Sequence, residues 1–381
     1  MIKIAVIGAG TVGVLSVIHF LGYTENVQVT CIHNPKKKIL GIGESSTVAM
    51  PTLLWETLNF NPEFDGQELQ FTFKTGVYYK NWRKDSFVSP IMPPSYAIHF
   101  DNFKLAEVIF KHVYLKYKNR FNELNIDIKS LKQDKNKVTI NEQHTYDYVI
   151  DCRGFPKDYS NYKKVKLPIN HCLVNGVEEP GNWNFTYHIA HKNGWMFGIP
   201  LKKRQGFGYL YNDNITSKND AINDFSQYFK NNFNKDNLRE YKFESYKAKN
   251  YINNRIMLNG NKALFYEPIE AISGLFYDYL NRIYFDHIFK NVSINESNNL
   301  AHDLAKRYEN FISYIYHGGS MHESDFWKYA SNLCSNNLKN DLWYETKNAI
   351  NEKATDHRRW PFSPLAWKIL DLHLYNNKNF N

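Results

Sequence analysis

Two patterns of hydrophobic residues follow each other at the start of the chain. A short, almost wholly apolar run at positions 2–7 is typical of a parallel strand that is buried on both faces. Hydrophobic residues then recur with the spacing i, i+3, i+4 and i+7, at Val14, Val17, Ile18 and Leu21. This spacing predicts an amphipathic helix, which we expect to end at Gly22.

A glycine-rich turn connects this predicted strand and helix. Gly8, Gly10 and Gly13 have the spacing of a dinucleotide-binding fingerprint, GxGxxG. In that fingerprint the first glycine forms the turn, the second lets the backbone approach a pyrophosphate, and the third allows close helix–strand packing. The helix N-terminus then faces the phosphates. We interpret this turn, with Thr11 and Val12, as a cofactor-binding site, and a glycine-rich turn without a ligand is the alternative.

Alternating apolar and polar residues predict a second strand, which lacks the acidic residue of an NAD-binding site. Val27, Val29 and Cys31 alternate with polar residues, which indicates a strand. In NAD-binding proteins an acidic residue near the end of this strand binds a ribose hydroxyl. Here the strand ends in Ile32-His33-Asn34. An NAD-dependent dehydrogenase is therefore disfavoured, and a ribose contact falls to Asn34 or to the backbone.

Later hydrophobic patterns complete the prediction of an α/β fold. Residues 102–116 have helical spacing with Asp101 as the expected N-cap, and residues 148–150 form a short apolar strand. Strand-like pieces within residues 165–260 predict a mixed sheet. A helical C-terminal part is predicted from the spacing of Leu304, Tyr308, Phe311, Ile312 and Ile315. We expect residues 375–381 to be frayed.

Composition narrows the class of protein. Of the 381 residues 43% are hydrophobic and 22% charged, which is typical of a globular domain rather than a disordered chain. No apolar run approaches the roughly 20 residues of a membrane span, and the glycine-rich turn begins too early to follow a signal peptide. Four cysteines without CxxC spacing favour reduced thiols in a cytoplasmic protein.

The net charge of +9 raises the possibility of a nucleic-acid partner. Most lysines are scattered along the chain, and the one tight run, 36–38, follows the second predicted strand. We therefore expect neither a nucleic-acid nor a membrane partner. The aromatic content of 16% is better suited to pockets for planar ligands.

Two further strand-end motifs favour FAD as the cofactor. Asp151-Cys152-Arg153-Gly154 follows the strand at 148–150, and Gly260-Asn261-Lys262-Ala263 follows the apolar residues 256–258. Either motif alone is weak, because a segment such as 260–263 can be an ordinary turn. Together with the glycine-rich turn they have the layout of an FAD-binding fold, which adds Asp151, Gly154, Gly260 and Asn261 to the predicted cofactor site.

With these motifs in place, the sequence resembles the flavin-dependent halogenases of the tryptophan-halogenase family over nearly its whole length. The resemblance extends through a helical region at 308–327, and its main segments are 41–45 (GIGES, similar to GxGE(A/S)), 73–82 (FK and NW), 97–101 (AIHFD, similar to YHFDA), 151–155 (DCRGF, similar to DCTGF), 194–201 (GWMFGIPL, similar to GWxWxIPL), 206–209 (GFGY, similar to GYGYV) and 265–273 (FYEPIEAIS, similar to FxEPLESTG).

Several positions depart from the family pattern. Phe197 stands in place of the second tryptophan of GWxWxIPL, and Ile272 and Ser273 stand at the Thr-Gly of PLESTG. Arg153, Asn261 and Lys262 replace commoner residues of the cofactor motifs. The chain is also shorter than typical tryptophan halogenases, which weakens tryptophan itself as the expected substrate.

The resemblance implies a cofactor, a halide and two partners. A separate NADH-dependent flavin reductase supplies reduced FAD, which reacts with oxygen and a halide, chloride or bromide, to give hypohalous acid. The backbone of Ile272 and Ser273 holds the halide. FAD is held in part by Gly41, Gly43, Glu44, Ser45 and Pro268, and the hypohalous acid reaches a small aromatic substrate past Trp195, Phe197, Ile199 and Pro200.

The resemblance also implies two catalytic residues. Lys74 hydrogen-bonds the halogenating species or forms a haloamine, and Glu270 orients or polarises that species or accepts the substrate's proton. Burial lowers the pKa of a lysine toward neutrality, and a nearby carboxylate is a suitable general base. The alternatives are a solvated surface lysine, a carboxylate that favours a helix dipole, and core packing for Trp195.

We therefore predict an α/β fold of the aromatic-hydroxylase type. Residues 1–290 form the FAD-binding domain with an interleaved mixed-sheet substrate region, and residues 291–381 form a helical part that covers the substrate site. The predicted activity is FAD-dependent halogenation of an indole-like or phenolic compound through Lys74. A flavin-dependent aromatic monooxygenase and a non-catalytic FAD-binding protein are the alternatives. We predict no metal site, because His99, His188 and His191 lack ligand spacing, and we leave a homodimer open.

Overall fold

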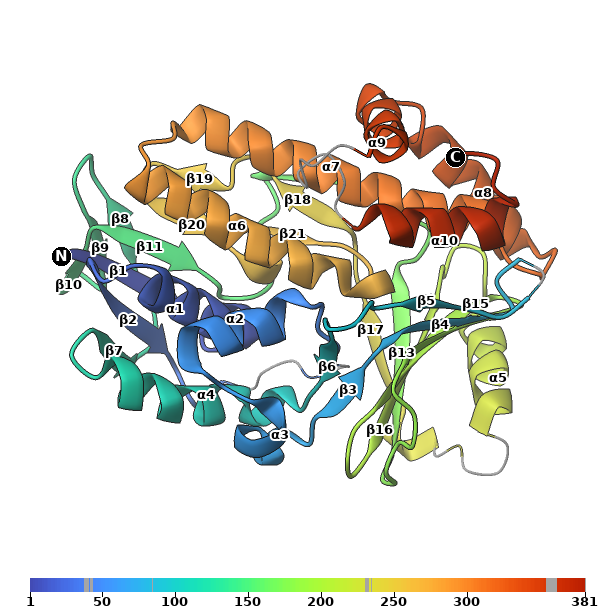
Figure 1. Ribbon diagram of the computed structural model, residues 1–381, viewed down its shortest axis with the longest axis horizontal. Helices are drawn as coiled ribbons and strands as arrows, with labels where there is room; N and C mark the ends of the chain where they lie inside the picture. Colours follow the sequence, from blue (N-terminus) through green and yellow to red (C-terminus); the bar gives the residue numbers. More distant parts are fainter. Residues whose placement is uncertain are drawn as a thin grey trace.

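The predicted first strand lies inside a six-stranded sheet in the computed structural model, which describes residues 1–37, 41, 44–83, 85–229, 233, 235–353 and 362–380. The strand order is β19-β20-β11-β1-β2-β7, with bounds Ile252–Asn253, Ile256–Leu258, Tyr148–Asp151, Ile2–Ile7, Val27–His33 and Phe121–Asn125. All neighbours are parallel except the β19–β20 pair. The parallel strands β1 and β2 are buried as their sequences predict, and Figure 1 shows them next to α1.

Four helices pack around this sheet, namely α1 (Thr11–Tyr23), α2 (Ala49–Leu58), α4 (Asn102–Tyr117) and α6 (Ile272–Phe289). Helix α1 contacts the other three, and nearly all its side chains from Val14 to Leu21 are buried. The predicted cap of α4 is confirmed, since the Asp101 carboxylate accepts a hydrogen bond from the Phe103 backbone N–H at 2.9 Å.

The predicted end of α1 at Gly22 is wrong by one residue, because the helix continues through Tyr23. Gly22 serves the contact between two helices instead. A Cβ atom at Gly22 would lie 2.2 Å from the Thr57 methyl carbon of α2. The absence of a side chain therefore lets α1 and α2 approach each other closely.

A second, seven-stranded sheet confirms the predicted mixed sheet. Its order is β17-β13-β16-β15-β14-β4-β5, with bounds Arg239–Lys242, His171–Val177, Gln205–Tyr211, Gly194–Pro200, Thr186–His191, Gly76–Lys80 and Phe87–Pro90. All pairs are antiparallel except β4 with β14. Every residue of β15 is buried, because one face meets the main core and the other packs under α5 (Lys218–Phe229).

Short strands and turns connect these sheets. A pair is formed by β3 (Thr72–Lys74) and β6 (Ala97–His99), and two small sheets contain β8 (Leu131–Gln133), β9 (Val138–Ile140) and β10 (His144–Tyr146), and β12 (Tyr162–Lys164), β18 (Tyr246–Ala248) and β21 (Leu264–Phe265). Short helical turns occupy α3 (Pro62–Asp65), Gln67–Leu69, Lys235–Asn237, Gly260–Lys262 and Ile269–Ala271.

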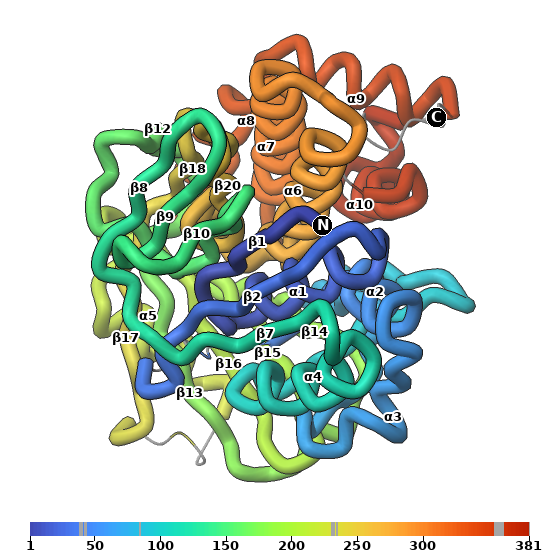
Figure 2. Tube along the Cα trace, turned by 90° about the vertical axis from the view of Figure 1, so that its left-hand side faces the viewer, coloured from blue at the N-terminus to red at the C-terminus, as the bar shows by residue number. Residues whose placement is uncertain are grey.

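The C-terminal part is helical, as predicted. It comprises α7 (Ile294–Gly318), α8 (Asp325–Asn337), α9 (Asp341–Asn351) and α10 (Pro364–Tyr375). Helix α7 runs along the upper side of the molecule next to α6, and the other three helices lie at its right-hand end (Figures 1 and 2). Helix α6 begins before residue 291 and packs against both α1 and α7. The domain boundary at residue 290 stays a prediction.

The expectation of a frayed C-terminal tail is wrong for its described residues. Phe380 is 4% exposed and packs against Tyr314, Trp343 and Trp367. The Asp371 carboxylate on α10 accepts hydrogen bonds from the backbone N–H groups of Asn379 and Phe380. Because a buried carboxylate and an aromatic side chain both fix the segment, it is held against the helices.

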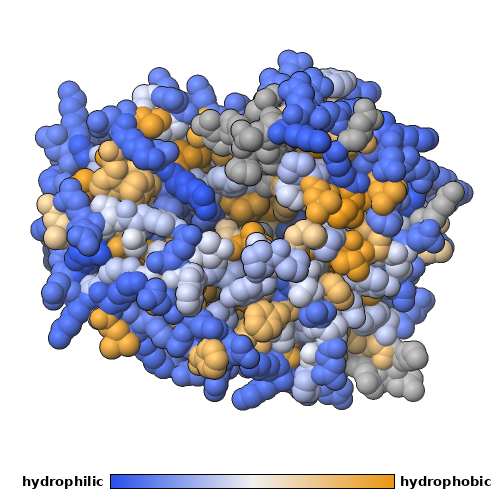
Figure 3. Space-filling model, in the orientation of Figure 1, coloured by the Kyte–Doolittle hydropathy of each residue, from blue (hydrophilic) through white to orange (hydrophobic). Residues whose placement is uncertain are grey.

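The face of the molecule that Figure 3 draws is mostly polar. Hydrophilic residues dominate the outline of the face in Figure 3, and hydrophobic residues gather toward its middle. No helix in the described ranges is long and apolar enough to cross a membrane. All four cysteines carry free thiols.

Candidate active site

The glycine-rich turn forms an open cradle at the N-terminus of α1. A Cβ atom at Gly13 would lie 1.8 Å from the Gly8 carbonyl oxygen, whereas a Cβ atom at Gly10 would have no neighbour within 4 Å. Gly10 is the N-cap of α1 and no side chain caps the helix. The first backbone N–H groups of the helix are therefore available to an anion such as a phosphate. This open cradle fits a dinucleotide.

The cradle predicts different effects for two glycine-to-alanine substitutions. We expect Gly13→Ala to lower the free energy of unfolding by about 3 kcal/mol, because the new methyl group overlaps fixed backbone. Gly10→Ala leaves the thermal midpoint unchanged, since its methyl group enters open space, but weakens FAD binding. Thermal denaturation and a flavin fluorescence titration measure the two effects. Equal FAD affinity in Gly10→Ala and the wild type would contradict the cradle.

The three predicted cofactor motifs lie at one edge of the sheet. Asp151 pairs in register with Ile7 of β1 and with Leu258 of β20, so the turns after these strands are neighbours. The Asp151 carboxylate binds the Arg153 guanidinium with contacts of 2.9 and 2.7 Å. Gly154 and Gly260 have φ values of +76° and +61°, a conformation that favours glycine.

Other predicted cofactor residues make contacts within the protein. The Thr11 hydroxyl donates to the Asn102 side-chain oxygen of α4 at 2.6 Å, and the Asn34 amide donates to Asp127 at 2.8 Å. Val12 lies beside Gly260, which joins the first and third motifs.

Among the described residues of the segment 41–45, one side chain belongs to the site. Glu44 faces Arg204 at 3.5 Å, and burial raises the pKa of Glu44 to about 7. A Cβ atom at Gly41 would meet the ring of Phe103. Gly43 lies outside the described residues. Ser45 is the member of this segment that reaches the cavity described next.

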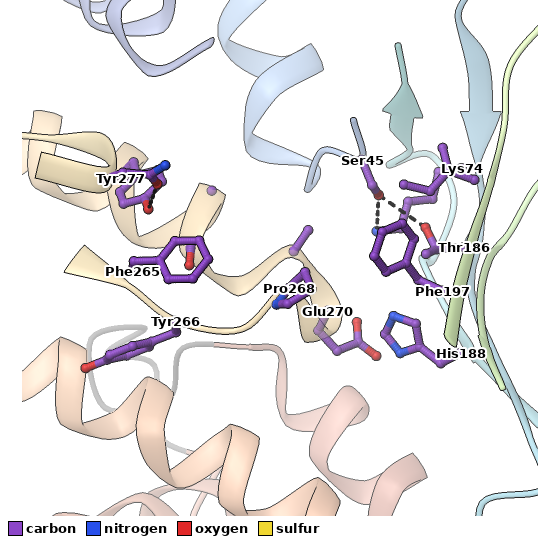
Figure 4. A pocket seen from close by; sticks show the side chains of 15 residues that line it. Ser45, Lys74, Thr186, His188, Phe197, Phe265, Tyr266, Pro268, Glu270 and Tyr277 are labelled. Atoms are coloured by element: carbon purple, nitrogen blue, oxygen red, sulfur yellow. Dashed lines mark hydrogen bonds between the residues drawn. The ribbon is translucent and has the colours of Figure 1, made fainter. Parts of the chain in front are cut away.

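A cavity of about 200 Å³ lies between the two sheets and the start of α6. Its wall combines segments that are far apart in the sequence, as Figure 4 shows for ten labelled side chains. The lining residues are Ser45, Lys74, Thr186, His188, Phe197, Ile199, Asn261, Phe265, Tyr266, Pro268, Glu270, Ala271, Ser273, Gly274 and Tyr277. Both predicted catalytic residues are among them.

Lys74 is a buried lysine at the end of β3, with an exposed fraction of 3%. Its ammonium nitrogen Nζ donates to the Ser45 Oγ at 3.0 Å and to the Ser46 carbonyl oxygen at 3.2 Å. Burial lowers the pKa of Lys74 to about 8, and the charge of Glu270 opposes this shift. A minor but appreciable share of the amine, about one fifth at pH 7.4, is therefore neutral.

Glu270 lies in a strained turn directly before α6. Glu270 and Ala271 have φ values of 58° and 53°, and two successive non-glycine residues in this region are costly. The Tyr79 hydroxyl of β4 donates a hydrogen bond to the Glu270 carboxylate. Burial raises the pKa of Glu270, while Lys74 and Tyr79 oppose the increase. The carboxyl group is thereby a stronger base than an ordinary glutamate side chain.

The predicted halide and tunnel residues lie in two places. Ile272 and Ser273 are the first residues of α6. The N-cap residue Ala271 makes no side-chain hydrogen bond, so no capping side chain binds the backbone N–H groups at the start of this helix. Phe197 and Ile199 line the cavity, whereas Trp195 and Pro200 do not. The Trp195 indole N–H instead donates to the Tyr316 hydroxyl at 2.6 Å, so the side chain anchors β15 to α7.

Sequence reasoning missed four polar residues around the cavity. Thr186 and His188 come from β14 and Tyr79 from β4, and Ser46 supplies a carbonyl oxygen to Lys74. Their roles follow from strand pairing between distant segments, for which a single sequence carries no signal. In the part of the chain that the structure describes, no three His, Cys, Asp or Glu side chains converge as metal ligands.

A second buried carboxyl group, Glu267, does not line the cavity. Glu267 is fully buried, and this burial raises its pKa from 4.5 to about 8. The folded protein therefore binds a proton that the unfolded chain releases between these pH values. Its contribution to stability is complete below pH 4.5 and is lost as the pH rises through 8.

Glu267→Gln should flatten this pH dependence, because glutamine keeps the shape of the protonated acid. Relative to this variant, we expect the wild type to lose on the order of 4 kcal/mol of unfolding free energy from about pH 4.5 to pH 8. Urea denaturation across this range measures the difference. Parallel pH profiles for the two proteins would show that Glu267 does not titrate this way.

Comparison with known proteins places these features in context. The sequence matches the tryptophan halogenase family over residues 3–146 and 128–359. It is 22% identical over 321 residues to tryptophan 7-halogenase RebH of Lentzea aerocolonigenes, a match that covers 75% of this chain and 58% of that protein. The chain spans about half the length of the curated relatives it matches.

Solved structures share the fold. BrvH, a flavin-dependent halogenase from Brevundimonas sp. BAL3, superposes with a TM-score of 0.80 at 14% identity, covering 98% of this chain and 89% of that one. A tryptophan halogenase from Shewanella frigidimarina NCIMB 400 also has a TM-score of 0.80, at 15% identity, with coverage of 100% and 89%. The predicted α/β fold of this type is confirmed.

Proposed function

Because the chain belongs to the tryptophan halogenase family, we propose that it is an FAD-dependent halogenase of a small electron-rich aromatic compound, indole-like or phenolic. The observation that carries the proposal is the buried Lys74, whose amine lines a cavity beside Glu270. A buried, solvent-shielded amine of lowered pKa is suited to react with or to hydrogen-bond an electrophile.

FAD is the cofactor of this proposal. The cradle at Gly10, the α1 N-terminus and the turns at Gly154 and Gly260 would hold its phosphates and ribityl chain. Ser45 and Pro268 line the cavity and would face the bound FAD. Bound reduced FAD, supplied by a separate NADH-dependent flavin reductase, would use oxygen to oxidise a halide to hypohalous acid.

The protein's own residues would divide the remaining tasks. The backbone N–H groups of Ile272 and Ser273, at the positive end of the α6 dipole, would bind chloride or bromide. Phe197 and Ile199 would form the passage from the cofactor side to Lys74. Glu270 would accept the proton that the aromatic ring loses on substitution, as a general base with a raised pKa.

The proposal extends to the assembly around the site. Residues 291–381 would cover the substrate, and the stacking of His373 of α10 on Phe87 of β5, at 4.3 Å between ring centroids, supports a clamp of this kind. A cytoplasmic location and a homodimer stay predictions.

Mass spectrometry tests the activity directly. The reaction contains the protein, FAD, a generic flavin reductase, NADH, oxygen, bromide and a panel of indoles and phenols. We expect a product with the bromine isotope doublet that depends on the protein and persists with catalase present. Catalase removes hydrogen peroxide, so it excludes bromination by peroxide formed when free reduced flavin reacts with oxygen. No brominated product from any member of the panel would count against the proposal.

A second cavity favours an aromatic monooxygenase as the other candidate. It measures about 400 Å³ and is lined mainly by aromatic side chains. Phe197, Phe265 and Pro268 line both cavities, whereas Lys74 lines the first and not the second. An aromatic compound bound in the second cavity would be separated from the lysine, and the same assay would then detect a product that gains oxygen without bromine.

A further inference from the structure

Lys74 is the first member of a chain of hydrogen bonds that crosses five segments of the protein, namely β3, the segment at Ser45, β14, β6 and β15. Its Nζ lies 3.0 Å from Ser45 Oγ, which lies 3.1 Å from Thr186 Oγ1. Thr186 Oγ1 lies 2.9 Å from His99 Nε2, and His99 Nδ1 lies 3.1 Å from Thr72 Oγ1. The chain ends at the Pro200 carbonyl oxygen, 2.7 Å from Thr72 Oγ1.

The carbonyl at the far end fixes the position of the hydrogen atoms. A carbonyl oxygen can only accept, so the Thr72 hydroxyl donates its single hydrogen to Pro200. Toward His99, Thr72 can then only accept, and His99 Nδ1 must carry a hydrogen. His99 is fully buried, and burial together with the charge of Lys74 lowers its pKa well below 6.5. The ring is therefore neutral, and its Nε2 is an acceptor.

The same argument continues to the lysine. Thr186 must donate to His99 Nε2, so Thr186 Oγ1 accepts from the Ser45 hydroxyl. Ser45 has then used its hydrogen, and its Oγ can only accept from Lys74. The Ser46 carbonyl accepts a second hydrogen bond from the same amine.

We propose that Ser45, Thr186 and His99 form a directional relay of hydrogen bonds. The relay makes Lys74 a hydrogen-bond donor toward Ser45 and leaves the lone pair of its neutral amine directed into the cavity. A neutral amine has two hydrogens and one lone pair, and the relay and Ser46 use both hydrogens. The lone pair remains for an electrophile in the cavity that Glu270 and Phe197 also line. Thr186 and His99 are thus positioning residues.

The purpose of the relay rests on the proposed function, but its direction can be tested without FAD. Cyanate is the probe, because its reactive form is a small neutral molecule that carbamylates neutral amines. Peptide mass spectrometry reports the carbamylation rate of Lys74 separately from other lysines. Rates are compared at about pH 9.5, above the Lys74 pKa of about 8. Every variant retains the other titratable groups that face Lys74 or Glu270, namely His188, Tyr79 and Glu270 itself.

Thr186→Val should slow carbamylation of Lys74 about fivefold, which corresponds to the net stabilisation that one hydrogen bond provides. Without an acceptor at Thr186, the Ser45 hydroxyl turns to the lone pair of Lys74 and blocks it. Thr186→Ser should restore the wild-type rate, because serine keeps the hydroxyl. The double variant Ser45→Ala, Thr186→Val should also restore it, because no hydroxyl then remains to block the amine.

The matched control is Thr75→Val, next to Lys74, which loses a hydrogen bond to the Asn184 carbonyl oxygen and should not alter the rate. A wild-type rate in Thr186→Val, or a slow rate that persists in the double variant, overturns the relay. A merely structural role of Thr186 predicts that persistent slow rate.

Nitrogen-15 NMR of histidine-labelled protein tests the direction independently, with His99→Gln assigning the resonance. We expect the neutral ring with hydrogen on Nδ1 at pH 7, and the opposite tautomer overturns the relay. Because both measurements omit halide and FAD, they separate failure of the relay from failure of the proposed halogenase activity.

Discussion

We expect Lys74→Met to abolish bromination while FAD binding stays at the wild-type level. The substitution keeps the buried aliphatic stem and removes the amine, which lines the cavity beside Glu270. Removal of one preorganised polar group from an active site lowers the rate by about 10²–10³-fold, and we expect at least this loss in product formation. Product is measured by mass spectrometry, and FAD affinity by fluorescence titration.

Lys80→Met is the matched control. Lys80 is an exposed lysine of β4, the strand that follows Lys74, and its replacement should leave product formation unchanged. Full activity of Lys74→Met would show that the reaction does not pass through this amine. Loss of FAD binding in Lys74→Met would show that the lysine belongs to the cofactor site.

We expect Glu270→Gln to lower product formation by about 10²–10⁴-fold, the contribution of a positioned general base. Glutamine preserves the hydrogen bond from Tyr79 but can neither accept the substrate's proton nor carry a charge opposite Lys74. Since the charge of Glu270 opposes the lowering of the Lys74 pKa, this variant should also shift the pH profile of Lys74 carbamylation to lower pH. The two effects are measured by product mass spectrometry and by the cyanate reaction.

Glu267→Gln tests whether the effect of Glu270→Gln depends on the position of the carboxyl group. Both carboxyl groups are buried, and the substitution is the same, three residues away. Because burial holds Glu267 mostly protonated at pH 7, glutamine imitates its ionic state there. We expect nearly full product formation from this variant. Equal losses in the two variants would mean that the turn before α6 is simply intolerant of glutamine.

Local patterns predicted most of the cofactor-binding fold. The run at 2–7, the glycines after it and the cap at Asp101 act over a few residues, and each is confirmed in β1, α1 and α4. The prediction that α1 ends at Gly22 was wrong because a glycine is needed there for the close approach of α2, not for the end of α1. The buried tail has the same cause, since its partners Asp371 and Tyr314 lie on helices whose packing no local pattern reveals.

The site itself was less accessible to sequence reasoning. Lys74 and Glu270 were found through a family resemblance, and their position at one cavity depends on the packing of β3 and β14 against the turn before α6. Nothing in the local sequence distinguishes Thr186 and His188 from other strand residues. They reach the cavity because β14 pairs with β4. Because pairing of distant strands depends on the whole sheet, a single sequence gives no rule for it.

The parallel pairing of β4 with β14 also determines at which stage of folding the cavity can form. Tyr79 and Glu270, which share a hydrogen bond, are 191 residues apart, and the hairpin of β4 and β5 must wait for β14 before it gains a partner. Closing such long loops is slow, because their entropy is lost before the contacts form. During synthesis the glycine-rich turn can therefore fold early, whereas the lysine meets its carboxylate only after α6 has been made.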